Sequence, residues 1–262
     1  MDAYLSRSPQ PPNRGNTYLM AYPTIVSVRD YGSGADASPK LVLMPGVINT
    51  GDLLTMCFDL NGTFNLTIDT PTSWVNYGSQ GNSDTSKLFM KRADGTEDGT
   101  TVSVSHSDFA GTQIACAQTL RITGWIEQDP VAGNVVSTGG VLNSDTLNLT
   151  GVPFTPGWGP GVETLWVSYL IVAGNQSLVT SPTGWSRYRS TQQGGTMRIH
   201  SAYYSSTDET LAIDSVVWTV SASTSLLGYL FAVRGPAPTP EGDLVVYADS
   251  PSMVIHQEVS IY

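Results

Sequence analysis

The sequence predicts an all-β protein built from two tandem, homologous antiparallel β-sandwich domains, with an extended arm at each end. Three observations predict this fold. Apolar and polar residues alternate with a period of two along many short segments, and helical periodicity is nearly absent. Clusters of Gly, Pro, Asn, Asp and Ser, which favour turns, separate these segments. A stretch of the first half recurs in the second half.

The alternation identifies individual strands and the face that each one buries. In the segment GDLLTMCFDLNG, one face carries Leu54, Met56, Phe58 and Leu60. In TQIACAQTLRI, one face carries Ile114, Cys116, Leu120 and Ile122, with Gln118 as its polar exception. Side chains of a strand point alternately to its two faces, so each set is expected to lie on a hydrophobic core.

The internal repeat is carried by a proline and a tryptophan with fixed spacing. The segments TPTSW and SPTGW place Pro71 and Trp74 against Pro182 and Trp185, at an offset of 111 residues. We expect each tryptophan to pack in a core or at a domain rim, because it recurs at one structural position. A sugar-stacking role for the two rings is the alternative.

The repeat also sets the size of the domains. The same offset of 111 residues aligns Leu54 with Leu165 near the start of each unit. Each unit then has about 85 to 90 residues, the size of one seven- or eight-stranded sandwich.

This alignment predicts a division of the chain into five parts. They are an N-terminal arm and lead-in at 1–36, a first sandwich at 37–127, a linker at 128–146, a second sandwich at 147–235 and a Pro-led β segment at 236–262.

Composition argues against several classes of function. Lys and Arg together number 12 against 22 Asp and Glu, which gives a net charge of −10. Only 13% of the residues are charged, about half the usual share. A basic footprint for phosphates is missing, so we expect no nucleic-acid partner. No run approaches the roughly 18 apolar residues of a membrane span, so we expect no membrane partner.

The beginning of the sequence and its cysteines indicate the compartment. The first 22 residues lack the basic and apolar regions of a secretory signal. Cys57 and Cys116 are too few for a disulfide scaffold, and we expect them to be buried, reduced thiols. The protein is therefore expected to be made and kept in a cytoplasm.

No constellation of residues indicates catalysis. His106, His200 and His256 lie in three different segments and lack the spacing of metal ligands. Nucleophile-elbow, zincin, P-loop and dinucleotide motifs are missing from the sequence. The sequence therefore predicts a protein that is not an enzyme and that needs no cofactor or metal.

Two acidic pairs leave one alternative open. Glu97–Asp98 and Asp208–Glu209 occupy equivalent places in the two units, where hairpin-turn residues are the simpler interpretation. Asp94 lies close to the first pair and adds a further carboxylate. Oxygen ligands cluster there, so calcium binding by Asp94, Glu97 and Asp98 stays open, although the twelve-residue calcium loop is missing.

The order of these motifs resembles a β-sandwich module of tailed-bacteriophage virion proteins. The resemblance is carried by Gly51-Asp52-Leu53-Leu54, by Pro71 and Trp74, and by Ala93-Asp94-Gly95-Thr96-Glu97. It covers about two thirds of the chain and is weaker in the second unit. It implies a structural role on the capsid exterior or the tail, and it implies no enzymatic residues.

The resemblance and the composition together favour a capsid decoration, or cement, protein that binds the outer shell and bridges neighbouring subunits. Its expected partners are the major capsid protein or other virion proteins, and further copies of itself in a homo-oligomer. Its expected location is the virion, after assembly in the host cytoplasm. The alternative is a tail or fibre component, or a receptor-binding protein that recognises a glycan.

The two arms are the expected attachment sites. The first is rich in proline, and the second contains the strand-like runs LVVYA and MVIHQEVSIY, which suit a hairpin or addition to the edge of a neighbouring sheet. The apolar residues expected to contact partners are Tyr4, Leu5, Tyr18, Leu19, Val245, Tyr247, Val254 and Ile255.

Overall fold

The computed structural model describes residues 22–36, 38–61, 68–81, 84–106, 113–126, 135–150, 154–159, 161–193, 195–207, 211 and 216–235. Throughout these residues the regular elements are β-strands, and the paired strands are antiparallel, as the sequence predicts. Within the same residues, no helix is long and apolar enough to span a membrane.

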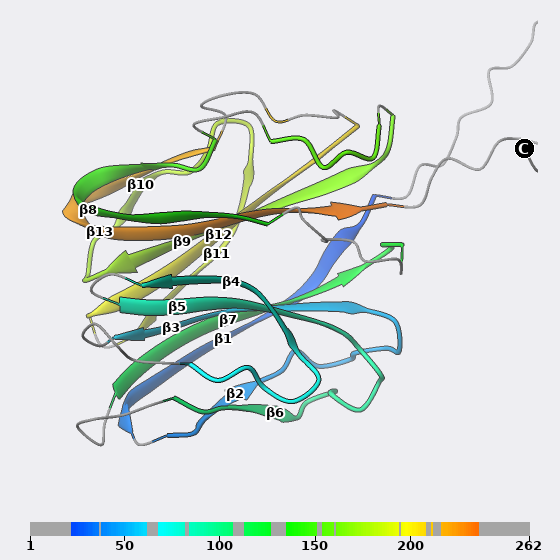
Figure 1. Ribbon diagram of the computed structural model, residues 1–262, viewed down its shortest axis with the longest axis horizontal. Coiled ribbons are helices and arrows are strands. Elements are labelled where there is room, and N and C mark those ends of the chain that lie inside the picture. The colour runs from blue at the N-terminus through cyan, green and yellow to red at the C-terminus, as the bar shows by residue number, and fades with distance from the viewer. Residues whose placement is uncertain are drawn as a thin grey trace, which may run out of the picture.

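The first half of the chain forms a five-stranded sheet (Figure 1). Its strands, in spatial order, are β1 (Thr24–Asp36), β7 (Gln113–Thr123), β3 (Leu53–Asn61), β5 (Asp84–Arg92) and β4 (Val75–Gly81). Two short strands, β2 (Lys40–Leu43) and β6 (Thr101–Val104), pair with each other on the outer side of this sheet.

The second half forms a larger sheet with the same internal order. From one edge it runs β8 (Val135–Asn148), β13 (Val217–Arg234), β9 (Thr164–Ala173), β12 (Met197–Ser206) and β11 (Ser186–Gln193), and β10 (Leu178–Thr180) also pairs with β13. Matching strands along the chain, the order β8-β13-β9-β12-β11 repeats the order β1-β7-β3-β5-β4. This common order supports the repeat. Homology of the halves and the domain boundaries stay predictions.

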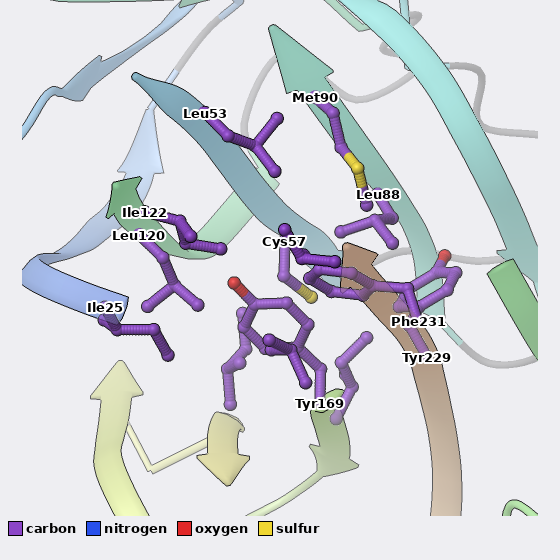
Figure 2. Packing of buried hydrophobic residues seen from close by; sticks show 14 of the residues in the cluster. Ile25, Leu53, Cys57, Leu88, Met90, Leu120, Ile122, Tyr169, Tyr229 and Phe231 are labelled. Atoms are coloured by element: carbon purple, nitrogen blue, oxygen red, sulfur yellow. The ribbon is translucent and has the colours of Figure 1, made fainter. Parts of the chain in front are cut away.

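The two sheets pack face to face and share one core. This central cluster takes buried side chains from both halves, as Figure 2 shows for Cys57 and Leu120 of the first sheet beside Tyr169 and Phe231 of the second. Its buried members among the described residues are Ile25, Leu53, Cys57, Leu88, Met90, Cys116, Leu120, Ile122, Leu165, Val167, Tyr169, Ile171, Met197, Ile199, Leu227, Tyr229, Phe231 and Val233. The halves are therefore not separate hydrophobic units, because each covers the inner face of the other.

Each sheet also buries its outer face. A first outer cluster contains the predicted set Leu54, Met56, Phe58 and Leu60, under β2 and β6. A second outer cluster contains Trp166, Leu170 and Trp218 of the second sheet. The central strands are consequently buried on both faces, and β3 is buried along its whole length except at Asn61.

The structure corrects the register of the sequence repeat by one residue in β3 and β9. Leu54 lies in the first outer cluster, whereas Leu165 lies in the central cluster. Leu53, which does lie in the central cluster, is the residue that corresponds to Leu165. A shift of one residue moves every side chain of a strand to the opposite face. The faces of β3 and β9 that point into the central cluster therefore match when Leu53 is aligned with Leu165. The offset between these two leucines is one residue longer than the offset of 111 residues between the two tryptophans.

The repeated Pro–Trp segment forms the same turn in both halves. The amide of Trp74 donates to the carbonyl of Pro71, and the amide of Trp185 donates to that of Pro182, both at 3.1 Å. The third residue of each turn has a positive φ, 64° at Ser73 and 80° at Gly184, as a type II turn requires. Trp74 is buried, as the core interpretation predicts, and Trp185 is half-buried.

Replacing Gly184 with Ala tests this turn. The new Cβ meets no atom within 4 Å, so its effect comes from the left-handed backbone alone. We expect the free energy of unfolding to fall by about 1–2 kcal/mol, measured by urea denaturation. Gly34→Ala is the matched control, because its Cβ is equally free and its φ is ordinary. A control that loses as much stability as the Gly184 variant would contradict the explanation.

Candidate functional site

The residues expected to contact partners all lie outside the described residues. These are Tyr4, Leu5, Tyr18, Leu19, Val245, Tyr247, Val254 and Ile255, in the arms at 1–21 and 236–262. The structure instead shows where the described chain begins, at Tyr22, and where it ends, at Gly235.

The two arms join the body at one place, which we call the arm root and define by Pro23, Gly124, Glu163 and Gly235. The amide of Gly235 donates to the carbonyl of Glu163 at 2.6 Å. A Cβ placed on Gly235 would lie 3.0 Å from Cδ of Pro23 and 2.8 Å from the Glu163 carbonyl oxygen. Pro23 and Gly235 are both buried. Figure 1 shows the start of β1, in blue, beside the end of β13, in orange.

Glycine is required at two positions of the arm root. Gly235 has no room for a side chain, since a Cβ there would overlap the Glu163 backbone. Gly124 has a φ of +72°, and its Cβ would lie 3.3 Å from the carbonyl oxygen of Tyr22. These close approaches place the segment before β1 against the segments that follow β7 and β13.

Glu163 is a buried carboxyl group within the arm root. It is 1% exposed, and neither of its carboxylate oxygens has a hydrogen-bond partner in the described part of the chain. Burial raises the pKa of Glu163. An acid whose pKa is raised by folding lowers stability as the pH rises through that pKa, so the ionised group opposes folding at neutral pH. Sequence reasoning did not single out this residue, because its isolation depends on contacts between distant segments.

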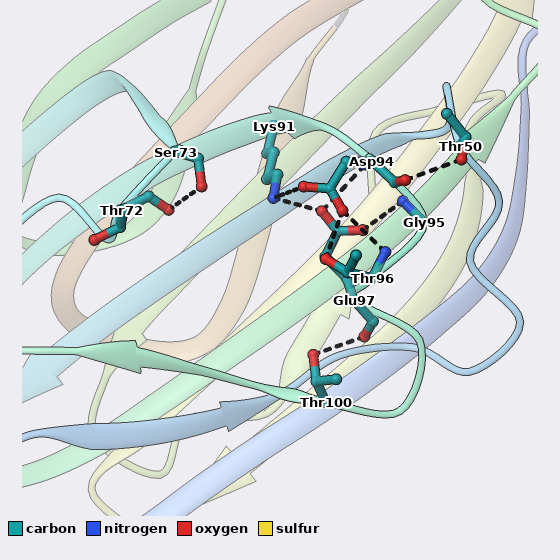
Figure 3. Close-up of polar contacts among 9 residues, drawn as sticks. All are labelled: Thr50, Thr72, Ser73, Lys91, Asp94, Gly95, Thr96, Glu97 and Thr100. Carbon is teal, nitrogen blue, oxygen red and sulfur yellow. Dashed lines mark hydrogen bonds and ion pairs between the residues drawn. The ribbon is translucent and has the colours of Figure 1, made fainter.

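The acidic turn at residues 94–98 is held by a lysine (Figure 3). Nζ of Lys91 lies 3.0 Å from Oδ2 of Asp94 and 2.5 Å from Oε1 of Glu97. Oδ1 of Asp94 accepts a hydrogen bond from the Thr96 hydroxyl at 2.5 Å and from the Thr96 amide at 2.9 Å. The bonds from Thr96, followed by that from Lys91, lower the pKa of Asp94 to about 2. Burial opposes ionisation of Glu97, but Lys91 and backbone amides outweigh it and lower its pKa.

These contacts leave the calcium interpretation without support. Oε2 of Glu97 accepts from the amide of Gly95 at 3.1 Å, and Oδ1 of Asp98 accepts from the amide of Val47 at 2.5 Å. The carboxylates therefore already bind an ammonium group and backbone N–H groups. Among the described residues, no group of three or more acidic, histidine or cysteine side chains is placed to hold a metal. The second acidic pair, Asp208 and Glu209, lies outside those residues.

Replacing Lys91 with Met is expected to remove the stability that this turn contributes above about pH 4. The lowered pKa values mean that the folded state favours the ionised carboxylates, so their contribution is complete above the ordinary values and is lost as the pH falls toward 2. Urea denaturation between pH 2 and pH 7 should therefore show wild type and Lys91→Met converging at low pH. A difference that is constant across this range would contradict the ion-pair account. Lys87→Met provides a comparison lysine on the same strand, β5.

The histidines and cysteines that the structure describes are buried. His106 and His200 are buried on different elements, and His256 lies outside the described residues. Cys57 and Cys116 are free thiols in the central cluster, and burial raises the pKa of both. A buried thiol with a raised pKa is unreactive, as the sequence interpretation expects.

A group of polar side chains, which we call the polar seam, joins the two sheets along one edge. It consists of Asp30 on β1, Gln118 on β7, and Arg189 and Thr191 on β11. Nε2 of Gln118 donates to Oδ1 of Asp30 at 3.1 Å and to Oγ1 of Thr191 at 3.2 Å, and Arg189 and Thr191 also contact the Asp30 carboxylate. Gln118 was the one signal in the sequence, because it interrupts an apolar face.

Two tyrosines make further bonds between the sheets. The Tyr169 hydroxyl lies 3.0 Å from Oγ1 of Thr55, and the Tyr229 hydroxyl lies 2.9 Å from Oγ of Ser86. Both bonds are buried, so they fix the position of one sheet on the other.

Comparison of the chain with protein-family models, with curated proteins and with solved structures finds no match. The resemblance to phage virion modules therefore rests on the sequence motifs alone.

Proposed function

We propose that the protein is a non-enzymatic structural component of a bacteriophage virion, a capsid decoration protein that attaches through its two arms. The observation that carries the proposal is the arm root, where the first and the last described residues, which adjoin the two arms, lie close together in the body. A body joined by a shared core and a polar seam gives such arms a fixed starting point. The partners proposed are the major capsid protein or another virion protein, and further copies of this chain.

The composition of the arms suits contacts with a partner. Ordering a backbone costs about 1–2 kcal/mol per residue, so apolar contacts must offset that cost. Burial of apolar surface contributes roughly 25 cal/mol per Å², and a few large side chains supply several kcal/mol. The eight apolar residues named above are suited to this role. The strand-like runs of the second arm add backbone hydrogen bonds when they extend a partner's sheet.

The location of the protein tests the proposal. An antibody against the body, residues 22–235, is labelled with gold and applied to purified phage particles of the source. We expect label over the capsid, and particles assembled without the protein should be unlabelled. Label on the tail would favour the alternative, and particles without label would contradict a virion role.

The alternative, a tail or fibre component that binds a host glycan, is favoured by one observation. Trp185 and Tyr204 are half-buried and stacked, with ring centroids 5.9 Å apart and an angle of 27° between the rings. Partly exposed aromatic rings are common platforms for sugars, whereas the matching Trp74 is buried. A glycan array probed with wild type and Trp185→Ala decides this point, with Val179→Ala as the exposed control. Binding that only the Trp185 variant loses would support the glycan role.

A further inference from the structure

Glu163 is a buried acid at the point where the described chain begins and ends. Its side chain is 1% exposed, and neither carboxylate oxygen has a hydrogen-bond partner among the described residues. Burial without hydrogen bonds penalises a carboxylate far more than the neutral acid. We propose that Glu163 is a pH switch, which lets the arm root close when it is protonated and opens the root when it is ionised. This switch belongs to the body and does not depend on what the arms bind.

The arm root must open before an ionised Glu163 reaches water. The amide of Gly235 donates to the Glu163 carbonyl oxygen at 2.6 Å. A Cβ on Gly235 would lie 3.1 Å from Cβ of Glu163 and 3.0 Å from Cδ of Pro23, so the backbones are in close contact. Since solvent reaches only 1% of the Glu163 surface in this arrangement, hydration of its carboxylate requires these segments to move apart.

The carboxyl group lies at the end of the apolar space between the sheets. Leu165 on β9 and Val233 on β13 both belong to the central cluster. Residues two apart along an extended backbone share a face, so Glu163 and Gly235 are the next residues on this inner face. An apolar neighbourhood gives no solvation to a charge, and it therefore favours the neutral form of the acid.

No cation in the described part of the chain pairs with Glu163. Arg234, at the end of β13, points away from the central cluster because the residue before it points into that cluster. Arg121 of β7 is paired with Asp52, Nε to Oδ2, at 2.5 Å. In the segment before β1 the titratable group is the phenol of Tyr22, which supplies no positive charge. Burial is accordingly the cause that raises the pKa of Glu163.

Proton linkage gives the direction of the switch. The raised pKa means that the closed root holds its proton more tightly than the open root does. The stability of the closed root is therefore complete below the ordinary pKa of a glutamate and is lost as the pH rises through the raised pKa. Within that window the ratio of closed to open root falls about tenfold for each pH unit.

Hydrogen exchange at Gly235 measures the switch in the full-length protein. Its amide is bonded to the Glu163 carbonyl, so it exchanges when the root opens. Wild type is compared at equal pH with Glu163→Gln, which keeps the shape of the side chain and does not ionise. We expect equal rates near about pH 4, and exchange about threefold or more faster in wild type near about pH 8.

Glu97→Gln is the matched control. Glu97 has the lysine partner that Glu163 lacks, because Nζ of Lys91 lies 2.5 Å from its Oε1. Exchange at Gly235 should be the same in this variant as in wild type at each pH. Urea denaturation adds a test of sign. Relative to wild type, Glu163→Gln should gain stability as the pH rises, whereas Glu97→Gln should lose it, because the pKa of Glu97 is lowered by folding.

Two results overturn the proposal. The first is an exchange rate at Gly235 that is the same in wild type and Glu163→Gln at every pH. The second is a stability difference that depends on pH while exchange at Gly235 does not, since ionisation would then act away from the root. If Glu163→Gln does not fold, Glu163→Met replaces it with the same expected rates. Wild type alone also decides, because protection of Gly235 that stays constant with pH, after correction for the intrinsic rate, contradicts the switch.

Discussion

Replacement of Phe231 with Ala is expected to destabilise both halves of the protein together. Phe231 is fully buried in the central cluster and stacks on Tyr169, with ring centroids 6.2 Å apart. Truncation of a buried Phe to Ala costs about 3–5 kcal/mol, a large part of the stability of an ordinary domain. The loss falls on both halves, because the cavity lies between the sheets.

The thiols of the first half report on this coupling. Phe231 belongs to the second half, whereas Cys57 and Cys116 belong to β3 and β7 of the first. We expect Phe231→Ala to increase the rate at which a thiol reagent labels both cysteines, and urea denaturation to show one transition. Val179→Ala, at an exposed site of the second half, is the control and should label as slowly as wild type. Two transitions with unchanged thiol labelling would show that the halves fold independently.

Deletion of the arms is expected to abolish attachment and to leave the body folded. Proteins that lack residues 1–21 or residues 240–262 keep every strand that the structure describes, together with both outer clusters and the central cluster. Loss of arm contacts worth several kcal/mol weakens binding by roughly a hundredfold or more. Cosedimentation with particles that lack the protein measures the occupancy.

Protection of the two cysteines provides the folding control for each deletion. Cys57 and Cys116 should stay unreactive in both shortened proteins, as in the full chain. Wild-type occupancy with both deletions would assign attachment to the faces of the sheets. The contact residues expected in the arms would then be the wrong ones.

Much of the fold follows from short-range features of the sequence. The alternation of Leu54, Met56, Phe58 and Leu60 predicts one buried strand face, and these residues do share one cluster. That pattern needs only the two-residue period of a strand. The Pro–Trp spacing likewise predicts a recurring local structure, because a type II turn is complete within four residues.

The packing of the two sheets on each other is decided at long range. Alternation tells which side chains share a face of β3, but it does not tell what covers the opposite face, where Leu53 and Cys57 lie. That cover comes from Tyr169 and Phe231, more than a hundred residues later in the chain. The same limit applies to Gln118, whose partner Thr191 belongs to the other sheet, and to the arm root. A local pattern specifies which surface a strand must bury, and only the assembled tertiary structure specifies against what, because burial energy is non-directional.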